Sequence, residues 1–249
     1  MSLCKHCVSG VRHEGSAEGK IETIGGIESY VATPTVDYPK DKVLLVFTDI
    51  LGIHFNNTQL IADDFARNGF KTIVPDILAG EPIPEEALDS GKFDVAAWIG
   101  RHQVDVYRPI IDKVIAALKE QGITTFATTG FCYGARPAFD LAFENITAVT
   151  VVNHPSLLQV PADLEKYRDL AKAPILINSC EIDPQFPKEA QEKADGILGG
   201  GKFAPGYERT YWDGCTHGFA IRGDLSNPKV KTGKEGAFKA SVEFLIKHL

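Results

Sequence analysis

The feature that most constrains the fold of this chain is an alternation of short apolar runs with helical patterns. Runs such as VLLVF at 43–47 and PILIN at 174–178 are typical of strands that are covered on both faces. Such runs predict strands at 27–32, 43–48, 71–75, 124–129, 148–153, 174–179 and 208–212. Between them, helices are predicted at 58–68, 103–120, 132–143, 188–198 and 234–248. The alternation favours a single doubly wound, mainly parallel α/β sheet flanked by helices.

Length and composition suit one globular domain. The chain has 249 residues, of which 44% are hydrophobic and 24% charged, and it contains no repeat or long linker. We therefore expect a single domain over 1–249 that begins with an N-terminal arm, 1–20. The formal net charge of −7 disfavours nucleic acid and anionic membranes as partners. No apolar run approaches the roughly 20 residues of a membrane helix, and no signal peptide is recognisable, so we expect a cytoplasmic protein.

The cysteines do not suggest a disulfide framework. There are five of them, an odd number in a long chain. Cys4 and Cys7 have zinc-like spacing, but no second pair of ligands completes a tetrahedral site. We therefore expect neither a metal nor a cofactor, and we interpret these two cysteines as part of the arm.

Reactive side chains follow several of the predicted strands. Asp49, Cys132 and His154 each come within three residues of a strand end, and Asp183 and His217 come within five. In doubly wound sheets, ligands bind beyond the carboxyl ends of the strands. The sequence therefore predicts a site at this edge that contains a thiol, two acids and several imidazoles.

The stretch Gly-x-Cys-x-Gly at 130–134 predicts a sharp strand-to-helix turn that projects Cys132 outward. A cysteine nucleophile needs a base, and the base needs an acid that fixes its tautomer. Cys132, Asp183 and His217 occur in the order nucleophile, acid, histidine that is found in α/β-hydrolase sheets. The backbone N–H groups of Tyr133 and Ile50 are the expected oxyanion donors.

Other interpretations of these residues exist. Cys132 could be a buried thiol between two turn glycines, Asp183 a turn residue before proline, and His217 a loop histidine. Glutamine amidotransferases of the triad type also contain Gly-x-Cys-x-Gly, but they pair it with His-x-Glu. The sequences that follow the two candidate histidines here, HPS at 154–156 and HGF at 217–219, lack that glutamate. A catalytic triad explains all three residues together.

Four longer segments carry a wider resemblance. They are VFTDILGIHFNNTQLIADDFARNGFKTIVPDILAGEP at 46–82, TTGFCYGARPAF at 128–139, CEIDPQFP at 180–187 and GCTHGFAIRGD at 214–224. With these, the chain resembles the dienelactone hydrolase family, the carboxymethylenebutenolidase-like branch of the α/β-hydrolases, and its fungal-like members in particular. The resemblance implies a cofactor-free enzyme that cleaves a lactone or small ester through a Cys-His-Asp triad.

The resemblance also implies further site residues. Asp49 corresponds to a carboxylate beside the resting thiol, although it is one methylene shorter than the family's glutamate. Family substrates carry a carboxylate held by arginines, so Arg222 is the first candidate for a substrate contact. Arg101 and His154 are further candidates. The alternative is a non-catalytic member of the same fold that binds or senses a small ligand. The sequence does not indicate the oligomeric state.

Overall fold

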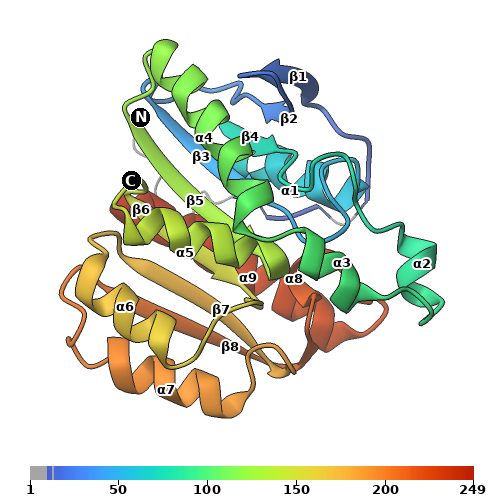
Figure 1. Ribbon diagram of the computed structural model, residues 1–249, viewed down its shortest axis with the longest axis vertical. Coiled ribbons are helices and arrows are strands. Elements are labelled where there is room, and N and C mark those ends of the chain that lie inside the picture. The colour runs from blue at the N-terminus through green and yellow to red at the C-terminus, as the bar shows by residue number, and fades with distance from the viewer. Residues whose placement is uncertain (1–9, 13) are drawn as a thin grey trace.

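The computed structural model describes residues 10–12 and 14–249 and contains one eight-stranded sheet (Figure 1). The sheet order is β1-β2-β4-β3-β5-β6-β7-β8. Both pairs that involve β2 are antiparallel, and all pairs from β4 to β8 are parallel. The strands are β1 (Lys20–Ile24), β2 (Ile27–Ala32), β3 (Lys42–Phe47), β4 (Thr72–Pro75), β5 (Thr125–Phe131), β6 (Val149–Asn153), β7 (Ile175–Ile182) and β8 (Tyr207–Thr216). This confirms the predicted doubly wound α/β fold.

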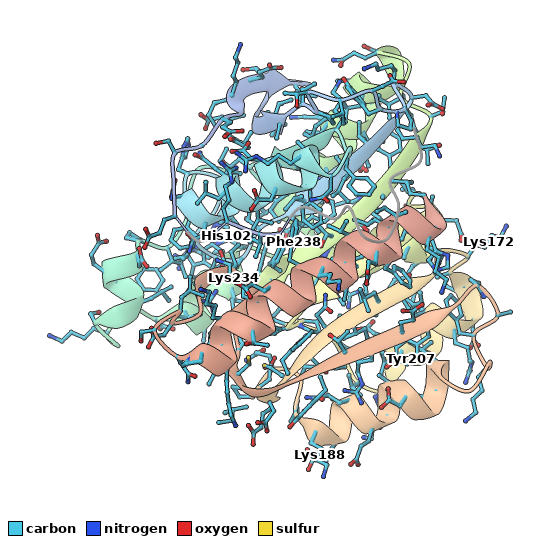
Figure 2. The ribbon with its side chains drawn as sticks, turned by 180° about the vertical axis from the view of Figure 1, so that it is seen from behind. His102, Lys172, Lys188, Tyr207, Lys234 and Phe238 are labelled. Atoms are coloured by element: carbon cyan, nitrogen blue, oxygen red, sulfur yellow. The ribbon has the colours of Figure 1, made fainter. Side chains whose placement is uncertain are left out.

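Helices cover both faces of the sheet. They are α1 (Asn56–Arg67), α2 (Glu85–Asp89), α3 (Val95–Arg101), α4 (Val104–Glu120), α5 (Ala135–Phe143), α6 (Ala162–Leu170), α7 (Lys188–Leu198), α8 (Phe219–Arg222) and α9 (Pro228–His248), with a 3₁₀ turn η1 at Cys132–Gly134. Figure 1 shows α4, α5, α6 and α7 in front of the sheet. Figure 2, from behind, shows α9 laid across the opposite face, which α1 shares.

Each face has its own apolar core. One core joins α4, α5, α6 and α7 to the sheet through side chains such as Val114, Phe139 and Tyr167. The other joins α1, α8 and α9 to it through side chains such as Phe65, Phe219 and Val242. Because both faces are covered, the central strands β3, β5 and β6 are almost completely buried, as their continuous apolar sequences predict.

The structure also differs from the predicted elements. Strand β1 and helices α2, α3, α6 and α8 were not predicted. Helix α9 begins at Pro228 rather than 234, because Asn227 caps it by accepting a hydrogen bond from the backbone N–H of Lys229. Strands β7 and β8 run several residues further than predicted. Cys4 and Cys7 lie outside the described residues. Within the described ranges, no helix is long and apolar enough to span a membrane.

Candidate active site

Cys132 lies at a strained turn between β5 and α5. Its φ is +51°, an uncommon value for a residue other than glycine. The flanking glycines make this turn possible: a Cβ on Gly130 would overlap the carbonyl of Gly134, and a Cβ on Gly134 would overlap the carbonyl of Phe47. The close approach of β5, the turn and β3 thus requires both glycines and holds the Cys132 sulfur at the carboxyl edge of the sheet.

Cys132, His217 and Asp183 form one chain of contacts. His217 Nε2 lies 3.1 Å from Cys132 Sγ, and His217 Nδ1 lies 2.8 Å from Asp183 Oδ1. The unpredicted ends of β7 and β8 bring the acid and the histidine together, since Ile182 pairs with Thr216 and its carbonyl accepts the backbone N–H of His217. Asp183 is held in place in turn, because its Oδ1 accepts hydrogen bonds from the backbone N–H groups of Gln185 and Phe186 at 2.8 and 3.1 Å.

The electrostatics of this chain favour a charged sulfur. Burial by itself raises the pKa of Cys132, but the hydrogen bond and charge of His217, with the charge of Arg222, outweigh it, so the net pKa is lowered. Burial lowers the pKa of His217, but its bonds to Asp183 and Cys132 raise the net pKa to about 9. Both shifts favour a thiolate beside an imidazolium, and the two groups titrate as a coupled pair.

Asp49 and Arg222 form an ion pair next to the thiol. Arg222 Nη1 donates to Asp49 Oδ2, and Asp49 Oδ1 accepts the backbone N–H of Leu51 at 2.9 Å. Asp49 is fully buried, whereas about a quarter of the Arg222 side chain is exposed. No contact between Asp49 and the thiol is found among the described residues. Asp49 therefore acts on Cys132 through its charge, with the Arg222 guanidinium as its direct partner.

Tyr133 and Ile50 lie where the sequence expects the oxyanion donors. Tyr133 is the second residue of the 3₁₀ turn that begins at Cys132, where a backbone N–H has no partner inside the turn. Its side chain is anchored by a hydrogen bond to the carbonyl of His102 at 2.6 Å. Ile50 follows β3, and its carbonyl accepts the N–H of Ile83 at 2.8 Å, which fixes the loop. Both residues line the pocket above Cys132.

The pocket above the thiol has a volume of about 190 Å³. Its apolar wall comes from Ile50, Val95, Ile99, Leu157 and Pro184. Its polar lining comes from Cys132, Ser156, Gln185, His217 and Arg222. The pocket therefore combines a mostly apolar wall with reactive groups at one end, the usual character of a small-molecule site.

Two predicted substrate contacts do not line this pocket. Arg101 is exposed and donates to the carbonyl of Ala97. It lies two positions after Ile99 on α3, so it points to a different side of that helix. His154 is completely buried beneath His217, with ring centroids 5.0 Å apart. Burial, followed by the charges of His217 and Arg222, lowers the pKa of His154 well below its usual value, so its ring is neutral.

Ser156 lies in the site, although the sequence analysis did not select it. Its Oγ is 3.3 Å from Cys132 Sγ and 3.4 Å from His217 Nε2. The available signal was its position three residues after β6, at the ligand edge of the sheet. A serine in such a loop is common in turns, so its type alone gave no reason to choose it.

The doubly wound sheet, with a cysteine elbow and an Asp–His pair at its carboxyl edge, defines the chain as an α/β-hydrolase. Comparison with known proteins narrows this class. The model of the dienelactone hydrolase family matches residues 27–249, and the chain belongs to this family. The resemblance inferred from the sequence is thereby confirmed, and the protein is a hydrolase of ester or lactone bonds.

Individual relatives match over nearly the whole chain. "Hydrolase pyvD" of Aspergillus violaceofuscus is 29% identical, covering 98% of this chain and 96% of its own. "Dienlactone hydrolase 1" of Gibberella moniliformis is also 29% identical, covering 98% and 92%. Among solved structures, one assigned as a dienelactone hydrolase from Klebsiella pneumoniae has a TM-score of 0.72 at 16% identity, covering 93% of this chain and 98% of that one. The similarity to this solved structure supports the assignment of the fold.

Proposed function

We propose that the protein hydrolyses a lactone or small ester through a covalent thioester on Cys132. The observation that carries this proposal is the unbroken chain from Cys132 Sγ through His217 to Asp183, with contacts of 3.1 and 2.8 Å. A nucleophile, a base and an orienting acid in that geometry are what acyl transfer through a side chain requires.

In the first half of the reaction, the thiolate attacks the carbonyl carbon, and the carbon–oxygen π electrons move to the oxygen. The backbone N–H groups of Tyr133 and Ile50 stabilise this oxyanion. The intermediate collapses, the ester carbon–oxygen bond breaks, and His217 Nε2 gives its proton to the departing alkoxide. In a lactone, the alkoxide stays tethered to the acyl group.

In the second half, neutral His217 takes a proton from water, and the resulting hydroxide attacks the thioester carbon. The carbon–sulfur bond breaks, the carboxylic acid leaves, and the thiolate–imidazolium pair is restored. Asp183 holds the imidazole in one tautomer and stabilises its cation in both halves. Side chains and backbone groups supply every step, so the proposed mechanism uses no metal or cofactor.

The pocket supports a small substrate with an apolar body. A volume of about 190 Å³ and a mostly apolar wall suit a compact ring or a short acyl chain. Arg222 is the cation at this wall, and of its five N–H donors one engages Asp49 and another the sulfur of Cys132. We propose that the remaining donors bind an anionic group of the substrate, such as a carboxylate. A cytoplasmic location, a single domain over 1–249, and the absence of nucleic-acid and membrane partners remain predictions from the sequence.

The test is a Cys132→Ala variant assayed with a panel of chromogenic esters and lactones. Wild-type protein should hydrolyse some of them, and the variant should lose activity by several orders of magnitude because the attacking sulfur has been removed. Near wild-type activity in the variant would contradict the mechanism. A panel that wild-type protein leaves untouched would favour ligand sensing, the alternative raised by the sequence.

Labelling gives a second readout of the same proposal. One equivalent of iodoacetamide should modify Cys132 in preference to Cys180 and Cys215. Those two thiols are completely buried, and burial raises the pKa of both. Preferential labelling of either one would remove Cys132 as the reactive thiol.

A further inference from the structure

Ser156 is held against the reacting sulfur by its own backbone. Its N–H donates to the carbonyl of Cys132 at 3.1 Å, while its Oγ lies 3.3 Å from Cys132 Sγ. The same oxygen is 3.4 Å from His217 Nε2. Ser156 is only 5% exposed, so water competes little for its hydroxyl. These contacts place one neutral hydroxyl beside both the thiol and its base.

The backbone on both sides of Ser156 is strained. His154 has φ of +37° and Leu157 has φ of +63°, and neither is a glycine. Such conformations are unfavourable for residues other than glycine, and they persist where the surrounding structure over-determines them, often at functional sites. Here the N–H of His154 is tied to the carbonyl of Asn178 at 2.8 Å. The loop thus has an unfavourable local geometry that keeps Ser156 beside the sulfur.

The protonation states of His217 and Cys132 decide which way the Ser156 hydroxyl points. When His217 is an imidazolium, its Nε2 carries a hydrogen and accepts nothing. That hydrogen is donated to Sγ at 3.1 Å, and because Nε2 is then no acceptor, the one hydrogen of Ser156 also points to Sγ, which accepts strongly as a thiolate. When the sulfur is a neutral thiol, it is a weak acceptor and the hydroxyl loses most of this bond. The geometry therefore favours the charged pair over the neutral pair.

We propose that Ser156 is a further catalytic residue, whose hydroxyl donates a hydrogen bond to Cys132 Sγ and stabilises the thiolate before attack. Its place in catalysis depends on the function proposed above, whereas its effect on the thiolate does not. Stabilising the thiolate raises the fraction of protein that is ready to react. Ser156 makes this contribution without adding a charge to the site.

Several charged or titratable groups also surround the thiol–imidazole pair, from every element packed against it. His217 after β8, Arg222 on α8 and Asp49 after β3 act on Cys132 itself, whereas Asp183 after β7 and His154 after β6 interact with His217. Ser156 is neutral and does not titrate, so its removal leaves both the total charge of the site and its set of titrating groups unchanged. A change in thiol titration after its removal therefore reports the lost hydrogen bond.

The experiment compares the pH dependence of iodoacetamide alkylation of Cys132 in wild-type protein, Ser156→Ala and Ser29→Ala. A hydrogen bond to a charged group is worth roughly tenfold or more in an equilibrium, so Ser156→Ala should shift the profile upward by about one pH unit. Ser29 is the matched control: it is also buried, but it lies on β2, where its hydroxyl donates to the carbonyl of Ile27. Its variant should match wild-type protein.

Two more variants sharpen the result. Ser156→Gly removes the same hydroxyl and should give the same shift, which covers the case of an alanine variant that does not fold. Ser156→Thr keeps the hydroxyl and should stay near the wild-type profile. A wild-type profile in both hydroxyl-free variants, or an equal shift in Ser156→Thr, would overturn the proposal.

The alkylation assay needs no substrate, so it separates this proposal from the proposed function. A shifted profile in a protein that hydrolyses no ester would support the role of Ser156 at the thiolate and refute the ester chemistry. An unshifted profile in an active esterase would refute the role of Ser156 alone. In an active enzyme, Ser156→Ala should also lower kcat/KM by about tenfold below the thiol transition, and much less above it.

Discussion

At the scale of single residues, the site depends on opposing effects at one sulfur atom. Burial favours the neutral thiol, whereas His217 and Arg222 favour the thiolate and Asp49 opposes it. The outcome depends on contacts of 3.1 to 3.4 Å, so a change of one polar group should be measurable in turnover. Asp183 and Arg222 allow the most direct tests.

Asp183→Asn should lower kcat by at least about a hundredfold while the protein stays folded. The Asn oxygen can still accept the N–H groups of Gln185 and Phe186, but the variant has no negative charge to stabilise the His217 cation or select its tautomer. Steady-state kinetics and a thermal melt check both expectations. The control is Asp213→Asn, since Asp213 is exposed and paired with Lys229, and it should be nearly silent. A loss below about tenfold for Asp183→Asn would point to another acid.

Replacing Arg222 with glutamine should change the selectivity between anionic and neutral esters. The variant also leaves Asp49 buried without its partner, so activity on both substrates is expected to fall. The ratio of kcat/KM for the anionic ester to kcat/KM for the neutral ester is unaffected by that shared loss. It should decrease by about ten- to a hundredfold, as expected for a lost charge-assisted hydrogen bond. An unchanged ratio would mean that Arg222 serves only to neutralise the buried charge of Asp49.

At the scale of elements, the short turn between β5 and α5 determines where the nucleophile lies. Arg136 occupies the first turn of α5, where the helix dipole disfavours a cation. The sequence therefore suggests an acidic partner, and the structure shows two: Asp140 at 2.5 Å and Asp163 on α6 at 2.6 Å. This network connects the helix behind the nucleophile to its neighbour, and the two glycines of the turn connect it to β3.

Gly134→Ala should destabilise the protein by several kcal/mol and abolish activity. Its added methyl group would overlap the backbone of Phe47, which cannot move without separating β3 from β5. Urea denaturation and the ester assay measure the two effects. The matched control is Gly196→Ala in α7, where a Cβ meets nothing within 4 Å. That variant should gain up to about 1 kcal/mol, because alanine favours helix more than glycine does. Equal stability of the two variants would contradict the packing argument.

At the scale of the whole molecule, one buried cation in the core behind the sheet limits stability. Lys234 on α9 is only 2% exposed, and Figure 2 labels it on that face. Burial lowers its pKa to about 8, although the charge of Asp64 acts in the opposite direction. Because the unfolded chain holds its proton up to the ordinary lysine value of 10.5, the folded state binds fewer protons between pH 8 and 10.5. This group therefore makes the free energy of unfolding rise with pH across that window.

Lys234→Met should raise the free energy of unfolding at pH 7 by about 1–3 kcal/mol, and this gain should shrink towards pH 10.5. Urea denaturation of variant and wild type at both pH values gives the difference, in which all other titrations cancel. Lys239→Met, on the exposed side of the same helix, is the control and should change little. A gain that stays constant with pH would show that packing, rather than the charge, is responsible.

The layered fold and the reactive groups can be predicted from local patterns in the sequence. Continuous apolar strands, the Gly-x-Cys-x-Gly turn and the order of Cys132, Asp183 and His217 are local signals, because strand burial and tight turns require particular residue types at fixed spacing. The elements that were missed lack such local signals. β1 has one buried residue among five and depends on pairing with β2, and α6 buries only Leu164 and Tyr167.

Which side chains meet in the site depends instead on the tertiary structure. Arg222 reaches Asp49 across 173 positions of sequence, and Ser156 reaches Cys132 across 24. His154 and Ser156 are separated by one proline, yet one is buried beneath His217 and the other lines the pocket. In a helix or strand, a repeating geometry relates side-chain direction to sequence position. The loops at the edge of this sheet have no such repeat, so the directions of their side chains depend on the packing of the whole fold.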